Sequence, residues 1–152
     1  MSQKINIRFG KAEDVENLVK FNRNMAIETE NKDLDKNTAN SGVLTMIANP
    51  NFGFYLVAEV EGQIAGSLMI TTEWSDWRNA QYWWIQSVYV MPEYRKQGIY
   101  RSLYEHVKEM ARNRKDVFGF RLYVEKQNHN AQETYKKLGM CETEYFMYEE
   151  NV

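Results

Sequence analysis

Between residues 81 and 113 an apolar strand leads through a short basic turn into a long helix, and this junction constrains the fold more than any other segment. Residues 81–90 are rich in aromatic and β-branched side chains, which favours a strand, and Pro92 ends it. From Gly98 to Asn113 the apolar residues share one face at helical spacing: Tyr100, Leu103, Tyr104, Val107, Met110 and Ala111.

The turn between this strand and this helix predicts an anion site. A helix N-terminus presents unpaired N–H groups and a partial positive charge, and glycine at Gly98 lets the backbone approach a phosphate closely. Arg95, Lys96 and Arg101 add formal positive charge. A pyrophosphate cradle is one interpretation. An ordinary helix start is the other, because one glycine in a basic turn is a weak signal.

The periodicity of the remaining chain predicts an α+β fold. Strands are expected over residues 5–9, 54–60, 63–73 and 117–124, and helices over 12–30, 38–48 and 130–138. Residues 140–149 are expected to supply the last strand or two. A three-stranded meander is thus followed by a β-α-β crossover, which gives a mixed sheet.

Length and composition limit the class of protein. The 152 residues suit one domain spanning 1–152. A net charge of −2 argues against a nucleic-acid partner. The single cysteine and the separated His106 and His129 predict no metal site. Without a long apolar run there is no signal peptide or membrane span, so we expect a soluble cytoplasmic protein.

A second group of residues lies near the C-terminus. Asn128 or Asn130 can cap the helix expected there. Ala131 and Tyr135 are four residues apart and share one helix face, so a ligand has room beside the phenol. The alternative is a tyrosine that simply packs on the sheet.

Together the two segments resemble the GCN5-related N-acetyltransferase (GNAT) family. Its motif V-x-P-x-x-R-x-x-G-x-G/A is matched by Val90, Pro92, Arg95 and Gly98, with Tyr100 in the last position. Its later motif, N-x-x-A-x-x-x-Y-x-x-x-G-F, is matched up to the final residue, where Met140 replaces Phe; the matching residues are Asn128, Ala131, Tyr135 and Gly139.

The resemblance extends from Ile5 to Tyr148 and looks closest to bacterial members. It implies an α/β/α sandwich whose mostly antiparallel, mixed sheet has six to seven strands, about four flanking helices and a splayed fourth strand. It also implies an enzyme, an acetyl-CoA-dependent acyltransferase that releases CoA.

The same resemblance implies the cofactor-binding residues. The backbone of Val88, Tyr89 and Val90 would bind the pantetheine arm as an added strand would. Asn128 and Ala131 would lie near the thioester arm, with Tyr135 beside the sulfur. The pyrophosphate would be held by the first helical turn, Arg101 and Ser102, and by the amides of the turn before it: Arg95, Lys96, Gln97, Gly98, Ile99 and Tyr100. The Tyr100 side chain should point away from the phosphates and pack on the sheet or flank the cofactor.

The implied reaction is direct attack of a primary amine, on a small molecule or a peptide, in a ternary complex. A backbone N–H near Val88 would stabilise the oxyanion, and Tyr135 would protonate the thiolate. Gln86 lies where relatives carry a glutamate base and cannot take a proton. Glu73, at the end of the expected strand 63–73 beside the aromatic loop, is the candidate base, and ordered water is the alternative. Cys141 is expected to be a buried apolar residue rather than a nucleophile.

Acidic and aromatic residues are candidates for the acceptor site. Glu28, with Glu30, Asp33 and Asp35 nearby, would attract a cationic amine; the alternative is a solvated helix end. Trp83 and Trp84 face opposite sides of the sheet, and one should be core. Trp84 would join Trp74 and Trp77 in an acceptor wall or a homodimer contact.

Two other classes of protein stay open from the sequence. One is a non-catalytic acetyl-CoA-binding sensor or regulatory module. The other is an α+β domain with no CoA site. Tyr135 favours the enzyme, because binding alone does not need a phenol beside the sulfur.

Overall fold

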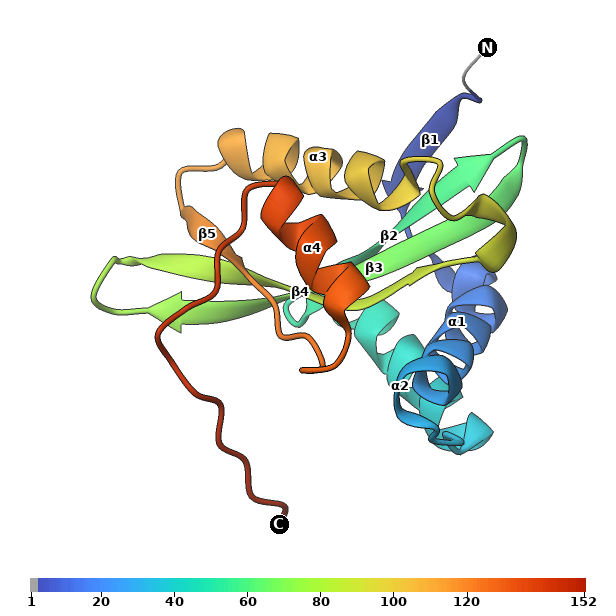
Figure 1. The fold of residues 1–152 in the computed structure, drawn as a ribbon, viewed down its shortest axis with the longest axis horizontal. Coiled ribbons are helices and arrows are strands. Elements are labelled where there is room, and N and C mark those ends of the chain that lie inside the picture. Colours follow the sequence, from blue (N-terminus) through green and yellow to red (C-terminus); the bar gives the residue numbers. More distant parts are fainter. Residues whose placement is uncertain (1–2) are drawn as a thin grey trace.

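The computed structural model describes residues 3–152, and within them five strands form one sheet in the order β1-β2-β3-β4-β5 (Figure 1). The first four strands pair antiparallel with their neighbours, and β5 runs parallel to β4. The strands are β1 (Ile5–Phe9), β2 (Gly53–Val60), β3 (Gln63–Ser75), β4 (Ala80–Val90) and β5 (Val117–Arg121). The predicted meander and crossover are both confirmed.

Helices cover both faces of this sheet (Figure 1). One face carries α1 (Val15–Glu30), which follows the 3-10 turn η1 (Ala12–Asp14), together with α2 (Lys36–Ala48). The opposite face carries α3 (Ile99–Arg112) and α4 (His129–Lys137). The α/β/α sandwich predicted from the sequence is therefore confirmed.

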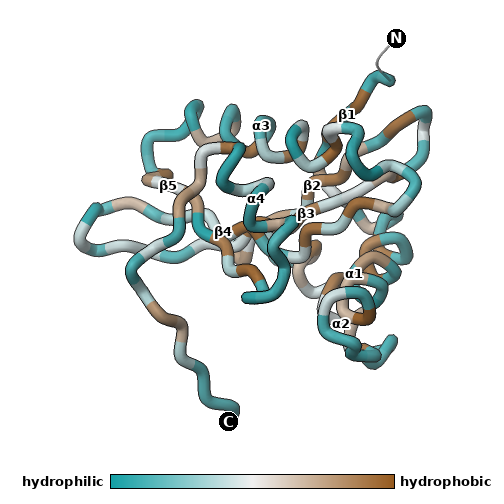
Figure 2. Tube along the Cα trace, in the orientation of Figure 1, coloured by the Kyte–Doolittle hydropathy of each residue, from teal (hydrophilic) through white to brown (hydrophobic). Residues whose placement is uncertain are grey.

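The two faces bury apolar clusters of different size. Under α3, the larger cluster joins Leu56, Leu68 and Trp83 of the sheet to Leu103 and Val107 of the helix, and all five are fully buried. Figure 2 shows the corresponding hydrophobic stretches along the strands. The smaller cluster lies under α1 and α2: Val15, Leu18, Val19, Val43, Met46, Tyr55 and Val57. Trp83 is the core tryptophan of the adjacent pair and Trp84 lies on the other face, as predicted.

A bulge in β4 makes this strand diverge from its neighbour. Ser67 pairs with Tyr89 and Met69 with Gln86, so two residues of β4 oppose one residue of β3. Ser87 adopts a left-handed φ of 50°, which bends the strand at this point. Pairing with β5 extends only to Trp84. The fourth strand is thus splayed, and residues 85–90 leave one backbone edge free toward β5.

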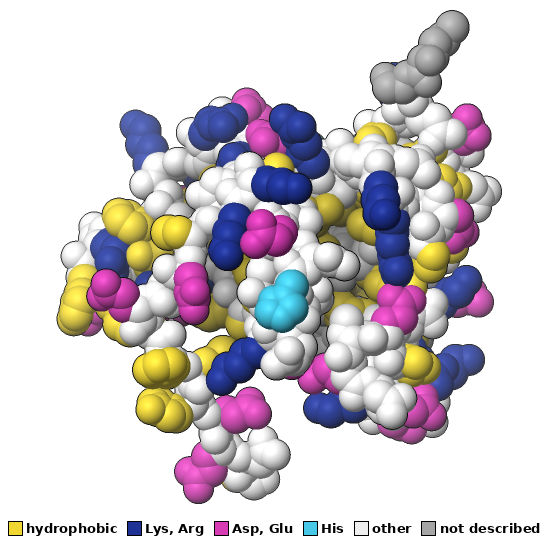
Figure 3. Space-filling model, viewed as in Figure 1, with side chains coloured by type: hydrophobic (Ala, Val, Ile, Leu, Met, Phe, Trp, Pro, Cys, Tyr) yellow, Lys and Arg dark blue, Asp and Glu magenta, His cyan; other side chains and the backbone are white. Residues whose placement is uncertain are grey.

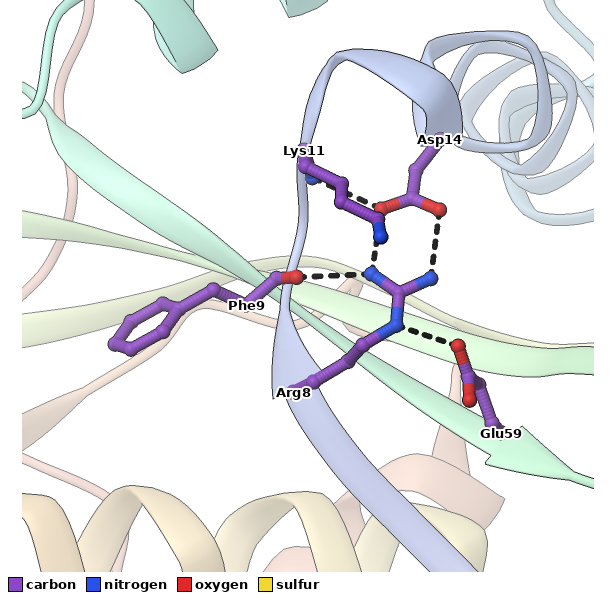
Figure 4. A network of polar contacts seen from close by, with 5 residues as sticks. All are labelled: Arg8, Phe9, Lys11, Asp14 and Glu59. Atoms are coloured by element: carbon purple, nitrogen blue, oxygen red, sulfur yellow. Dashed lines mark hydrogen bonds and ion pairs between the residues drawn. The ribbon is translucent and has the colours of Figure 1, made fainter.

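A polar network attaches the start of α1 to the sheet (Figure 4). Arg8 of β1 donates to both carboxylate oxygens of Asp14 at 2.8 Å and also pairs with Glu59 of β2. Asp14 is buried and additionally accepts from the Lys11 backbone N–H at 2.9 Å. The hydrogen bonds from Arg8 lower the pKa of Asp14, so its carboxylate stays ionised inside the fold.

The C-terminal segment departs from the sequence prediction. The expected strand over residues 140–149 does not form, so the described chain has five strands rather than six or seven. Cys141, predicted to be buried, is exposed. The apolar residues Tyr145 to Tyr148 are consecutive instead of alternating, so a strand here would place apolar side chains on both of its faces. Among residues 3–152 no element covers either face of such a strand, since residues 141–152 are all exposed.

Candidate functional site

The turn between β4 and α3 has the backbone geometry of an open anion site. Gly98 is the N-cap of α3 with a left-handed φ of 79°, and Lys96 is also left-handed at 62°. A Cβ placed on Gly98 would meet no atom within 4 Å, so the first turn of α3 faces open space. Ile99 is buried in the core and can offer only its amide. The backbone is therefore what this turn presents to a ligand.

The Arg95 side chain is committed to the protein itself. Its Nε donates to the Val90 carbonyl at 2.9 Å, and its Nη2 pairs with Glu28 at 2.8 Å. The second oxygen of Glu28 accepts from the Tyr89 hydroxyl at 2.8 Å. Glu28 therefore connects the C-terminal half of α1 to the end of β4 and to the basic turn. Lys96 and Arg101 remain exposed in the first part of the α3 junction.

Tyr100 turns inward, as the sequence predicted. Its ring packs on the core, stacks on Tyr104 at 6.0 Å between centroids and meets Tyr135 edge-on at 5.6 Å. Its hydroxyl is buried and finds no hydrogen-bond partner among residues 3–152. Burial raises the Tyr100 pKa, so the group is a neutral donor. An unpaired buried hydroxyl costs about 1–3 kcal/mol.

The second sequence motif meets the first through this aromatic contact. Asn128 caps α4, where its side chain accepts from the Ala131 amide at 3.2 Å. Tyr135 lies two turns further along α4 and is half-buried against Tyr100. Burial raises the Tyr135 pKa, so its phenol is protonated at neutral pH. The segments around residues 98 and 135 thus lie next to each other.

Between these helices runs the free edge of β4. The side chains of Val88 and Val90 pack toward the α3 core, whereas Tyr89 points to the opposite face and contacts Phe21 of α1 at 5.2 Å between ring centroids. This edge and the open turn at Gly98 together fit an elongated ligand with a phosphate end. Acetyl-CoA has this form.

On the other face of the sheet a cavity of about 690 Å³ opens between α1 and α2. Its lining is mostly apolar and includes Met25, Leu34, Met46 and Met69. Among the described lining residues, Glu30 is the one that carries a charge. Ser87, the residue at the β4 bulge, also lines it. The bulge is therefore common to the free strand edge and to the cavity.

Ser87 and Met69 were not among the sequence candidates. Asn22 and Met25 share one face of the first helix with Val15, Leu18 and Val19 at helical spacing, and this spacing was the available signal for part of this cavity. No residue type marked the bulge, because the left-handed residue is a serine and not a glycine. The bulge follows from the strand register alone.

The predicted acidic residues are mostly paired. Asp35 caps α2 by accepting from the Thr38 amide at 2.8 Å, and Asp33 pairs with Arg23 at 3.2 Å. Glu73 accepts from Trp84 Nε1 at 3.0 Å and from Arg121 at 2.7 Å, so both of its oxygens are engaged.

The predicted aromatic wall is spread out. Trp74 and Trp77 lie at the end of the β3–β4 hairpin, where they are 62% and 85% exposed. In the described chain the cavity lining includes neither of them, nor Trp84. Trp84 instead lies beside Tyr123, at 6.3 Å between ring centroids.

A strand edge beside a helix N-terminus, with a partly buried tyrosine pair next to it, suits an acyl-CoA-binding α+β protein. The chain belongs to the Acetyltransferase (GNAT) family, whose sequence pattern matches residues 16–140. The class of enzyme and its cofactor, an N-acetyltransferase that uses acetyl-CoA, follow from this membership.

Individual relatives agree with the family assignment. A possible acetyltransferase from Clostridium difficile 630 is 43% identical over 97% of both chains, with a TM-score of 0.91. A predicted acetyltransferase from Clostridium acetobutylicum, solved with acetyl-CoA, is 19% identical and has the same fold; it covers 97% of this chain and 96% of its own, with a TM-score of 0.78.

A Bacillus subtilis (strain 168) protein assigned as a ribosomal protein bS18-alanine N-acetyltransferase is 36% identical over 95 residues. The match covers 62% of this chain and 58% of that protein.

Residues 3–152 contain neither a helix suited to cross a membrane nor a side-chain cluster suited to hold a metal ion. Their helices include none with both the length and the apolar composition needed to cross a membrane. The same residues contain no group of three or more His, Cys, Asp or Glu side chains placed to hold a metal ion.

Proposed function

We propose that this protein acetylates a primary amine, on a peptide or a small molecule, by direct attack in a ternary complex. The carrying observation is the β4 bulge at Ser87, which belongs both to the free strand edge and to the cavity between α1 and α2. A thioester held along the strand edge and an amine entering through the cavity would meet at this point. Neither partner would need to leave its own side of the sheet.

The chain's backbone would bind the cofactor. Val88 offers its amide and carbonyl on the free edge and Val90 offers its amide, and these groups would pair with the pantetheine arm like an added strand. The amides from Arg95 through Ile99 would hold the pyrophosphate at the N-terminus of α3. Acetyl-CoA supplies the activated acyl group of the reaction.

Tyr135 is the proposed acid. Because burial keeps its phenol neutral, it can donate a proton to the departing thiolate. The Tyr100 hydroxyl next to it would donate to the same cofactor, which would satisfy its missing hydrogen bond. A backbone N–H near Val88, at the splayed part of β4, would stabilise the developing oxyanion.

The general base of the reaction is proposed last, because the candidate Glu73 already accepts hydrogen bonds from other residues. Gln86 donates to Thr71 and has no basic atom, and Glu73 would first have to release Trp84 or Arg121. We therefore propose Glu73 as a base only through such an exchange, or through ordered water. Glu30 is the carboxylate that faces the cavity directly.

The cavity also indicates the type of acceptor. A lining rich in methionine and leucine would favour an amine that carries an apolar group. The related Bacillus subtilis protein is assigned as an N-acetyltransferase that acts on the alanine of ribosomal protein bS18. We therefore propose a peptide N-terminus with a small apolar first residue as the acceptor to test first.

A turnover screen tests this function. Purified protein is incubated with acetyl-CoA and a panel of N-terminal peptides, free amino acids, polyamines and alkylamines, and CoA release is measured. Peptides with an apolar first residue should give the highest kcat/KM. Matched peptides that differ only in a charged first residue serve as the control.

Stabilisation of the fold by acetyl-CoA distinguishes the enzyme and the non-catalytic sensor from a domain with no CoA site. Acetyl-CoA at 100 times its Kd should stabilise the fold by about 2.7 kcal/mol. Stabilisation without turnover of any amine would identify a sensor or regulatory module. No stabilisation at saturating cofactor would exclude the CoA site itself.

A further inference from the structure

The carboxylate of Glu28 joins the cavity side of the molecule to the cofactor turn. Glu28 lies in the last turn of α1, and the same helix lines the cavity with Met25 and Glu30. Its two oxygens accept from the Tyr89 hydroxyl and from Arg95 Nη2, both at 2.8 Å. Figure 3 shows acidic and basic side chains side by side where the turn between β4 and α3 approaches α1. One carboxylate thus bridges α1, the end of β4 and the basic turn.

The stability of the fold gives little reason for a carboxylate at this position. A negative charge in the last turn of a helix opposes the helix macrodipole. The Arg95 and Glu28 side chains are 43% and 41% exposed, and an ion pair exposed to this extent contributes little to the free energy of unfolding. The contact therefore points to a role at the turn itself.

The turn needs support from outside, because its backbone is in an unfavourable conformation. Lys96 has a left-handed φ of 62°, which residues other than glycine keep only where their surroundings hold them. The Gln97 side chain donates to the Glu93 carbonyl at 2.9 Å, a contact that stays inside the turn. Arg95, directly before Lys96, is the residue that reaches other elements.

Arg95 is held from three sides. Its Nε donates to the Val90 carbonyl at 2.9 Å, its guanidinium lies 5.5 Å from the centroid of the Tyr89 ring, and Glu28 holds its other end. The Tyr89 ring packs on Phe21, a buried residue of α1. Burial, with the Glu28 carboxylate beside it, raises the pKa of Tyr89, so the hydroxyl keeps the proton that it donates. A fixed anchor therefore lies directly before the amides of the turn.

We propose that Glu28 is a positioning residue for the cofactor: by holding Arg95, it presets the amides of the turn for the pyrophosphate of acetyl-CoA. This inference rests on the proposed placement of the pyrophosphate at the turn. A turn that is already ordered loses less conformational entropy when it binds a ligand, so its affinity is higher. The pairing with Arg95 also offsets the charge of Glu28, which alone would repel the phosphates.

The sign of the effect distinguishes positioning from simple charge repulsion. Glu28→Gln removes a negative charge near the phosphate site, so relief of repulsion would strengthen acetyl-CoA binding. Loss of positioning weakens it. Glu28→Asp keeps the charge but is one carbon shorter, which draws the carboxylate back from Tyr89 and Arg95. Both variants should weaken acetyl-CoA binding roughly tenfold, the scale of one hydrogen bond to a charged group.

Isothermal titration of the full chain with acetyl-CoA measures this affinity for the wild type and both Glu28 variants. Glu16→Gln is the matched control, because it removes an exposed carboxylate from the first turn of the same helix. The control should bind acetyl-CoA as the wild type does. Without ligand, all three variants should melt close to the wild type, since only exposed or half-exposed charges are changed.

Backbone amide relaxation of the unliganded protein locates the effect. Order parameters of residues 95–99 should be near the rigid value of about 0.85 in the wild type and lower in both Glu28 variants. Those of residues 18–22 in α1 should not change. A merely structural role of Glu28 would instead lower the melting temperature and loosen α1 as well.

Equal or tighter acetyl-CoA binding by Glu28→Gln would overturn the proposal. Weaker binding with unchanged order parameters at residues 95–99, or an equal loss of affinity in Glu16→Gln, would overturn it as well. Gly98→Trp separates the two levels of the argument. If that variant binds acetyl-CoA normally, the placement of the pyrophosphate fails and this proposal fails with it. If it loses binding while Glu28→Gln does not, the proposal for Glu28 alone fails.

Discussion

The two faces of the sheet are built for different tasks. Under α3 and α4, strand and helix side chains close into a continuous apolar core, and the cofactor turn is attached directly to it through Ile99 and Tyr100. Under α1 and α2, the core is smaller and a cavity of about 690 Å³ stays open. The side that would bind the cofactor is thus tightly packed, and the side that would admit the acceptor is not.

This difference has a physical origin in what each face must bind. A cofactor of one fixed shape is best held by a preformed backbone surface, since rigidity lowers the ordering cost of binding. An acceptor face must leave room for a substrate and exclude water only when one is bound. The β4 bulge connects the two faces through a single strand, so changes on one face can be separated experimentally from changes on the other.

The largest effect is expected from closing the cofactor turn. Gly98→Trp fills the open space at the start of α3 and should weaken acetyl-CoA binding at least about 100-fold, or about 2.7 kcal/mol. Isothermal titration measures this affinity. Gly62→Trp is the matched control, because Gly62 has a similar φ of 77° and open surroundings in the β2–β3 turn. Normal binding by the Gly98 variant would place the cofactor elsewhere.

The hydrogen bonds from Arg8 to Asp14 attach the start of α1 to the sheet. Asp14→Asn should therefore lower the free energy of unfolding by roughly 2–3 kcal/mol. The folded-state pKa of Asp14 is lowered by Arg8, so this stabilisation is complete above the unfolded pKa of about 4 and is lost as pH falls through the folded pKa. Urea denaturation at about pH 7 and about pH 3, on either side of that unfolded pKa, should show the two proteins converging in acid. An unchanged difference at both pH values would contradict this role.

Removing the proposed acid should affect chemistry without binding. Tyr135→Phe is expected to lower kcat roughly 10- to 100-fold while acetyl-CoA affinity changes little. Because the Tyr135 pKa is raised, the wild-type kcat should not fall from loss of this proton until pH exceeds about 10. Steady-state kinetics across pH measure both effects. A kcat equal to the wild type would remove Tyr135 from the acid role.

The smallest effect is expected from narrowing the cavity. Gly42 of α2 lines it, and a Cβ at this position would meet no atom within 4 Å, so the first side-chain carbon of Gly42→Leu has room. The change should stabilise the helix by up to about 1 kcal/mol and raise the acceptor KM roughly three- to tenfold. Asn37→Leu adds the same side chain to α2 outside the cavity and should leave KM unchanged. Equal acceptor KM values in the two variants would show that the acceptor does not bind in this cavity.

Helix and strand positions were predictable where the apolar period was regular. The face of α3 that carries Leu103 and Val107 is an example, and its buried side matches the predicted one. Gly98 and Tyr135 could be named as candidate site residues because glycine suits a tight turn and a phenol can donate a proton. The cavity could not, since its lining combines α1, α2 and three strands that are distant in sequence.

The candidate base and acceptor residues show that a suitable residue type does not by itself fix the partners or the position of a side chain. Glu73 has a suitable side chain, but its oxygens are engaged by Trp84 and Arg121 from two other strands. Trp74 and Trp77 have suitable rings, but the β3–β4 hairpin extends beyond β2 and carries them away from the cavity. Partners and distances of this kind depend on strand register and length, which the local pattern does not encode.

By itself the sequence determined the order of the elements, the helix proposed to receive a phosphate and the family to which the chain belongs. These properties depend on local periodicity and on a few residues at fixed spacing. The tertiary structure alone decided that Ser87 bends β4 toward the cavity, that Tyr100 keeps an unpaired hydroxyl beside Tyr135, and that the C-terminal segment stays uncovered. The reason is that each depends on which surfaces meet across the sheet, and contacts between distant segments are fixed only when the whole chain packs.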